Sequence, residues 1–146
     1  MAQDGAGDRM STLAELCRRS GVQALYVFGS RAHQVQQWLA GVLSALPPSG
    51  SDVDIGVKAR PGSLASAWDR VRLQIALEDL LGVSRVDLVL LHEADPFLAV
   101  NVIRGERLYA EDAYCADEYE LYVLRRAGDL APLERERIAL LLGEAS

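Results

Sequence analysis

The sequence predicts an α/β (α+β) domain in which a small mixed β-sheet packs against helices. Three short apolar segments typical of buried strands alternate with longer segments whose apolar residues recur at helical spacing. The three strand segments are residues 24–28, 53–57 and 86–91. The length of 146 residues is that of about one domain, and it suffices to bury a core without a disulfide or structural metal.

The N-terminal segment divides into a polar part and a helical part. Residues 1–10 are polar and glycine-rich, which predicts a disordered tail. A helix is expected from Ser11 onward, and Gly21 is placed to end it. Its apolar residues at helical spacing are Leu13, Leu16 and Cys17. The core domain is expected over residues 11–110.

The connection between the first two strand segments is long and has a helical pattern of its own. Its recurring apolar residues are Val35, Trp38, Leu39, Val42, Leu43 and Leu46. Because Pro47 and Pro48 interrupt this pattern, we predict a helical insertion over residues 33–48. The insertion either projects outward and leaves the flanking strands adjacent, or it displaces Ser30. We expect the first, since surface insertions cost little free energy.

Helical spacing also marks the segment between the second and third strands. Residues 64–81 predict a helix, and Gly82 is placed to end it. After the third strand, residues 96–103 predict a short helix and residues 107–109 an edge strand. These elements complete the expected core.

Residues 111–146 are expected to form a C-terminal helical extension. Two separate helices fit its apolar pattern, at residues 114–126 and 132–142. The second is expected to start at Pro132, because proline lacks a backbone N–H and is tolerated in a first helical turn.

Composition excludes several classes of function. The chain has 15 Lys and Arg against 21 Asp and Glu, a formal net charge of -6. Broad nucleic-acid surfaces need clustered basic residues, so no nucleic-acid strand is expected as partner. Cys17 and Cys115 lie far apart, which indicates neither a disulfide framework nor a zinc site. No apolar run approaches the roughly 18 residues of a membrane span, so we expect a cytoplasmic protein without a membrane partner.

Paired carboxylates stand on the second strand segment. Asp52 and Asp54 are two residues apart, so both project from the same face of a strand. Like charges held this close repel unless a cation or proton joins them, and Mg²⁺ suits such a site. Asp87, at the start of the third strand segment, is placed to join the pair. Three carboxylates can hold two divalent ions for phosphoryl or nucleotidyl transfer.

A glycine–serine turn follows the first strand segment. Gly29 lets the backbone approach a ligand closely, and Ser30 offers a hydroxyl and a backbone N–H to a phosphate. Arg31 offers a cationic fork, and a helix starting here would add partial positive charge. Each motif alone is also typical of a solvated face or an ordinary turn, and their combination favours a phosphate-handling site.

Three further features have two interpretations each. His33 either contacts a nucleotide or is a surface side chain, and we expect the second. The apolar stripe around Trp38 is expected to pack on its own domain, with partner docking as the alternative. The C-terminal tyrosines are expected to pack between helices, with base stacking or self-modification as the alternative. They are Tyr109, Tyr114, Tyr119 and Tyr122.

Three motifs together carry a family resemblance: Gly29-Ser30-Arg31-Ala32, Ser51-Asp52-Val53-Asp54-Ile55-Gly56-Val57 and Val86-Asp87-Leu88-Val89. The chain resembles nucleotidyltransferases of the DNA polymerase beta type, above all the short bacterial MNT-type members. It departs from them in the long connection between Ser30 and Asp52, which are 22 positions apart, and in lacking the usual second glycine after residues 29–32.

The resemblance implies specific roles. Gly29 and Ser30 would hold the triphosphate of ATP, and Arg31 matches the pattern in position. Asp52, Asp54 and Asp87 would bind Mg²⁺, and Asp87 would also help to activate the acceptor hydroxyl. AMP would be transferred with pyrophosphate as leaving group. In MNT-type proteins the acceptor is expected to be a tyrosine of a partner HEPN ribonuclease toxin, which makes this chain the antitoxin.

Two rival functions stay open. One is nucleotidyl transfer to a small molecule, as in aminoglycoside nucleotidyltransferases, although few residues follow the third strand segment to bind such an acceptor. The other is a catalytically weak antitoxin that acts by partner binding alone. The oligomeric state, as a homo-oligomer or a hetero-oligomer, is also open.

Overall fold

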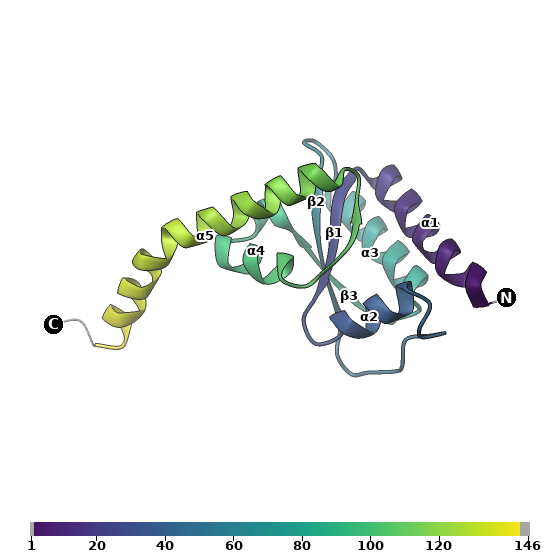
Figure 1. Cartoon of the computed structure of the whole chain (residues 1–146). Helices are drawn as coiled ribbons and strands as arrows, with labels where there is room; N and C mark the ends of the chain where they lie inside the picture. The colour runs from purple at the N-terminus through teal and green to yellow at the C-terminus, as the bar shows by residue number, and fades with distance from the viewer. Residues whose placement is uncertain (1, 144–146) are drawn as a thin grey trace.

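A four-stranded mixed sheet forms the centre of the computed structural model, which describes residues 2–143 (Figure 1). Its strands are β1 (Val22–Phe28), β2 (Val53–Ala59), β3 (Val86–Leu90) and β4 (Glu106–Ala110). The order across the sheet is β3-β2-β1-β4. β1 is antiparallel to both neighbours, and β2 is parallel to β3. The predicted mixed α/β fold is confirmed, with β4 at the edge.

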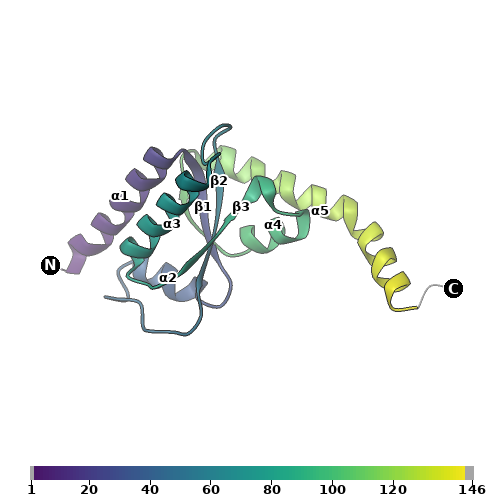
Figure 2. The same ribbon diagram turned by 180° about the vertical axis from the view of Figure 1, so that it is seen from behind.

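Helices cover both faces of this sheet (Figures 1 and 2). One face packs against a layer made of α1 (Ala2–Ser20), α2 (Ala32–Leu39) and α3 (Ala67–Leu81). The other face packs against α4 (Pro96–Ile103) and α5 (Ala113–Leu141), with a short 3-10 turn, η1 (Leu91–Glu93), before α4.

Alternation along β2 assigns its side chains to the two faces. Val53, Ile55 and Val57 are buried in the core beneath α1 to α3. Because successive residues of a strand point to opposite sides, the residues between them face α4. At Gly56 a Cβ atom would collide with Val102 of α4, so glycine permits this close approach. β2 therefore buries its branched residues on one side and presents Asp54 on the other.

The N-terminus differs from the predicted disordered tail. Helix α1 begins at Ala2, whereas Met1 lies outside the described residues. Arg9 makes tertiary contacts that the polar composition of this segment did not predict. Its guanidinium donates to the carbonyl oxygens of Trp38 (2.5 Å) and Leu43 (2.8 Å) and stands 4.6 Å from the centre of the Trp38 ring. The polar N-terminal segment is thus helical, and Arg9 connects it to the loop that follows α2.

The helical insertion predicted over residues 33–48 is shorter in the structure. Helix α2 ends at Leu39, and the chain is then irregular up to Asp52. Gly41 adopts a left-handed conformation with φ of 82°, and its N–H bonds to the carbonyl of Trp38. Such a glycine is a common end to a helix, because the conformation is costly for other residues.

The C-terminal extension is one helix where two were predicted. Helix α5 runs through Pro132, which lies in its interior instead of its first turn. It packs on the sheet through Ala116, Val123 and Ala127, and its later turns extend beyond the rest of the protein (Figure 1). Residues 144–146 of the predicted extension lie outside the described residues. Within residues 2–143, no helix is both long and apolar enough to cross a bilayer.

Candidate functional site

Strand register brings the predicted carboxylates to one end of the sheet. Asp54 pairs with Phe28 across the β1–β2 ladder and with Asp87 across the β2–β3 ladder. The irregular insertion thus leaves β1 and β2 adjacent, as expected. Asp54 and Asp87 therefore share the face covered by α4 and α5. Asp52 directly precedes β2 and is close enough for its negative charge to act on Asp54.

Gly29 lies directly against this acidic group. It follows β1 in a left-handed conformation with φ of 78°. A Cβ atom at this position would collide with Oδ2 of Asp54. Because Gly29 has no side chain, the Asp54 carboxylate lies against the backbone of the turn that leads into Ser30. The glycine–serine motif and the D-x-D motif form one site.

The carboxylates of Asp52, Asp54 and Asp87 repel one another. Burial raises the pKa of the Asp54 carboxyl, and the negative charges of Asp87 and Asp52 raise it further. Asp52 has one cationic neighbour, Arg85, whose Nε stands 3.4 Å from Oδ2. Arg85 offsets part of this charge, although it is well exposed and the pair is weak. A cation bound here would relieve the remaining repulsion.

A cavity of about 310 Å³ opens beside the glycine–serine turn. Gly29, Ser30 and His33 line it, together with Asn101 of α4 and Arg104, which directly follows that helix. His33 lines the cavity and is exposed, as expected of a surface side chain, and its contact with a nucleotide stays the alternative. No local sequence pattern marks Asn101 and Arg104, because only the packing of α4 on the sheet brings them here.

Gly105 is the local signal that could have indicated the close packing of the end of α4 against β1. A Cβ atom at Gly105 would collide with the carbonyl oxygen of Val27 in β1. The end of α4 can therefore sit against the end of β1 only because residue 105 is glycine. Arg104, the residue before it, is thereby held at the cavity.

Arg31 is not brought to this cavity. Its side chain is buried, 6% exposed, and its Nη2 donates to the carbonyl oxygen of Pro47 at 2.6 Å. Nε donates to Oε1 of Gln34 at 3.2 Å. The guanidinium that the sequence predicts as a phosphate ligand instead ties the irregular loop to the start of α2.

The donor set fits Mg²⁺ in kind. Carboxylates are its preferred side-chain ligands, and it is usually held by one or two of them together with substrate phosphates. Within residues 2–143, no three His, Cys, Asp or Glu side chains converge closely enough to hold an ion by themselves. Asp52, Asp54 and Asp87 therefore do not form a ready-made three-ligand site, and their role in holding an ion stays a prediction.

Comparison with known proteins identifies the family and the fold of the chain. A family model described as polymerase beta, nucleotidyltransferase matches residues 11–114. A comparison with curated proteins gave no match. A solved minimal nucleotidyltransferase shares 32% identity and covers 72% of this chain and 92% of its own, with a TM-score of 0.51.

Two toxin–antitoxin structures are also similar in fold. One, solved with AMP-PNP, shares 24% identity, covers 90% of this chain and 94% of its own, and has a TM-score of 0.62. The other is a tri-AMPylated HEPN toxin of Shewanella oneidensis in complex with an MNT antitoxin. It shares 20% identity, covers 97% of this chain and 99% of its own, and has a TM-score of 0.64. Because the family model spans well over half of the chain and the fold agrees with it, the chain belongs to the polymerase beta nucleotidyltransferase family.

Proposed function

We propose that this protein is a Mg²⁺-dependent nucleotidyltransferase that moves AMP from ATP to an acceptor hydroxyl. The observation that carries the proposal is the contact between Asp54 and the Gly29 backbone, with Asp87 beside Asp54 in the sheet. That contact joins a phosphate-binding turn to a set of carboxylates whose charges repel. An ATP–Mg²⁺ complex supplies both a triphosphate for the turn and a cation for the acids.

The residues divide the work by chemistry. Gly29 and Ser30 present backbone N–H groups and a hydroxyl to the triphosphate, and Arg104, which lines the same cavity, adds a positive charge. Asp52 and Asp54 would hold Mg²⁺, which neutralises the charge developing on the phosphates. The acceptor oxygen bonds to the α-phosphorus, the bond to pyrophosphate breaks, and the acceptor proton passes to Asp87. The protein positions these groups and forms no covalent bond itself.

We further propose that the acceptor is a tyrosine of a HEPN-type ribonuclease toxin, for which this chain serves as a cytoplasmic antitoxin. The similar fold of an MNT antitoxin in complex with an AMPylated HEPN toxin supports this choice. The AMP-PNP complex of a related fold supports ATP as the donor.

The test is transfer of labelled AMP from ATP to a HEPN partner in the presence of Mg²⁺. We expect Asp54→Asn to lower transfer by about 100-fold or more, because it removes a metal ligand. Asp79→Asn is the matched control, since Asp79 is an exposed acid on α3 away from the site. Undiminished labelling by Asp54→Asn would refute the metal role. Inhibition of the toxin without labelling would instead identify a partner-binding antitoxin.

The same assay separates the acceptor classes. Labelling is expected on the partner and to be lost when its acceptor tyrosine is changed to phenylalanine. Transfer to an aminoglycoside, with none to the partner, would favour the small-molecule function and overturn the tyrosine assignment.

A further inference from the structure

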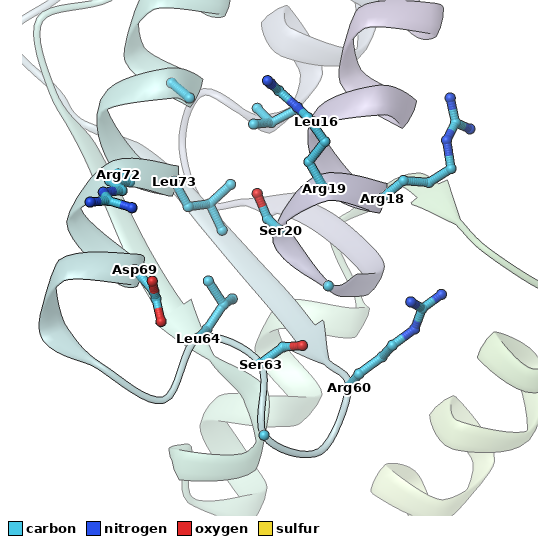
Figure 3. A pocket seen from close by; sticks show the side chains of 13 residues that line it. Leu16, Arg18, Arg19, Ser20, Arg60, Ser63, Leu64, Asp69, Arg72 and Leu73 are labelled. Atoms are coloured by element: carbon cyan, nitrogen blue, oxygen red, sulfur yellow. The ribbon is translucent and has the colours of Figure 1, made fainter.

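A second cavity, of about 690 Å³, is shown in Figure 3. It lies at the opposite end of the sheet from the candidate nucleotidyltransferase site. Gly21, which precedes β1, and Arg60, which follows β2, help to line it. The site described above follows the other end of β1, a strand of 7 residues. At about 3.3 Å per residue the two sites lie roughly 23 Å apart. They also lie on different faces, because this cavity is bounded by α1 and α3.

Arginines concentrate around this second cavity although the chain as a whole is acidic. Its four lining arginines are Arg18, Arg19, Arg60 and Arg72. Arg18 pairs with Glu15 and Arg60 with Glu111, both in exposed ion pairs that are weak in water. Arg19 of α1 and Arg72 of α3 make no ion pair or side-chain hydrogen bond within residues 2–143. These two guanidiniums are available to an anion.

The base of the cavity is apolar. It is lined by Leu16, Leu64 and Leu73, which belong to the hydrophobic core. Asp69 lines the same cavity from α3 and provides a hydrogen-bond acceptor near Arg72 (Figure 3). An inorganic anion alone would make no use of the leucines or of Asp69. A ligand with an apolar ring, hydroxyl groups and an anionic end would use all three kinds of group.

Backbone strain occurs at the same place. Leu64 is the one non-glycine residue within 2–143 that has a positive φ, at 56°. Arg70 holds this conformation by donating from Nε to the Leu64 carbonyl oxygen at 3.0 Å. Strained backbone is retained where surrounding contacts enforce it, and it is concentrated at binding sites. The loop that contains Leu64 is tied to the residue after α1, because the backbone N–H of Arg60 donates to the carbonyl oxygen of Gly21 at 2.8 Å.

We propose that this cavity is a second ligand site, which binds a nucleoside phosphate apart from the site of nucleotidyl transfer. Arg19 and Arg72 bind the phosphate oxygens, the leucines contact the base, and Asp69 accepts from the ribose hydroxyls. Planar guanidiniums pair with phosphate oxygens through two parallel hydrogen bonds. The volume of the cavity, about 690 Å³, lies in the range of small-ligand pockets. The net charge of -6 on the chain disfavours an extended polyanion such as RNA.

The test is calorimetric titration of the full chain with ADP in EDTA, where no divalent ion supports binding at the carboxylates. We expect one saturable site that Arg19→Gln/Arg72→Gln weakens by about tenfold or more, because two charge-assisted contacts are lost. Arg125→Gln/Arg126→Gln is the matched control: it removes the same charge from exposed positions on α5, and its affinity for ADP is expected to be unchanged.

Three outcomes would overturn the proposal. One is the absence of ADP binding by the wild-type chain, and another is an equal loss of affinity in both double variants. The third is inorganic phosphate that binds as tightly as ADP, or an RNA oligonucleotide that binds where ADP does not. Since all the variants change surface arginines, their melting temperatures are expected to match the wild type and to show that folding is intact.

Discussion

The carboxylate of Asp54 rests against the backbone of Gly29, with no room for a Cβ atom between them. The two residues are 25 positions apart in the chain, yet the β1–β2 ladder makes them neighbours. This contact puts the glycine–serine turn beside the acids. We therefore expect that adding a single methyl group at residue 29 disturbs the candidate site.

Replacing Gly29 with alanine should disable the site. The methyl group collides with Oδ2 of Asp54, and we expect AMP transfer to fall by about 100-fold, since small displacements of reacting groups carry costs of that order. The matched control is Gly62→Ala, because Gly62 also has a positive φ, 85°, but has open space around it. Both variants should lose about 1 kcal/mol of stability from backbone strain. Equal transfer by the two variants would contradict the contact.

Asp54→Asn should stabilise the fold while it abolishes activity. The pKa of this carboxyl is raised by burial and by Asp87 and Asp52. Between its ordinary and raised pKa values the folded state binds more protons than the unfolded state, so stability falls as the pH rises through that interval. The penalty then persists at neutral pH, and asparagine removes it.

Thermal denaturation in EDTA tests whether Asp54→Asn raises or lowers the stability of the fold. At pH 7 the Asp54→Asn protein is expected to melt above the wild type, and the difference should vanish below about pH 3.5, where the carboxyl is protonated in both states. Mg²⁺ at pH 7 should raise the melting temperature of the wild type more than that of the variant. A variant that melts below the wild type at pH 7 would show that the acids do not repel.

The buried hydroxyl of Tyr26 should make Glu120 important for stability. Tyr26 is 0% exposed, and its OH donates to Oε2 of Glu120 on α5 at 2.7 Å. Glu120→Ala leaves this donor unpaired, so we expect a loss of about 1–3 kcal/mol in the free energy of unfolding. Urea denaturation measures it. Glu134→Ala, in the exposed pair with Arg137, is the control and should leave that free energy unchanged.

Arg9→Ala should loosen both the N-terminal turns of α1 and the irregular loop after α2. It removes donors to the carbonyl oxygens of Trp38, Leu43 and Ser44. We expect a loss of about 1–2 kcal/mol and faster amide exchange in residues 6–12 and 40–46. Arg18→Ala, which breaks only an exposed pair with Glu15, should change neither. Unaltered exchange in the Arg9 variant would mean that this guanidinium does not hold the two segments together.

The two thiols should react at very different rates. Burial raises the pKa of Cys17 to about 12, whereas Cys115 is exposed. Because the thiolate is the reactive form, a disulfide reagent at pH 8 should modify Cys115 rapidly and Cys17 only after unfolding. Cys115→Ser protein should therefore show almost no fast reaction. A fast thiol in that variant would place Cys17 at the surface.

Much of the architecture follows from local sequence. The apolar runs of β1, β2 and β3 and the helical spacing of α3 and α4 are read within windows of a few residues, and all five elements are present. The D-x-D spacing places two acids on one face because strand side chains alternate. Turn chemistry is equally local, as the left-handed Gly21, Gly29 and Gly82 show.

What sequence reasoning missed depends on partners distant in the chain. Residues 2–10 are helical, and Arg9 in this segment bonds to the Trp38 carbonyl oxygen. Arg31 bonds to the Pro47 carbonyl oxygen and does not line the cavity beside Gly29. Pro132 remains inside α5, where a local pattern indicated a new helix. Asn101 and Arg104 join the site only through the packing of α4 against β1.

The sequence by itself determined the strands, the alternation that turns Asp52 and Asp54 to one face, and the glycine that allows a close approach. These are properties of backbone geometry and of neighbouring residues. Only the tertiary structure decided that Asp54 meets Gly29, that Asp87 stands beside it, and that Arg31 is occupied elsewhere. Strand pairing and side-chain packing set those contacts, because they join residues that no local pattern connects.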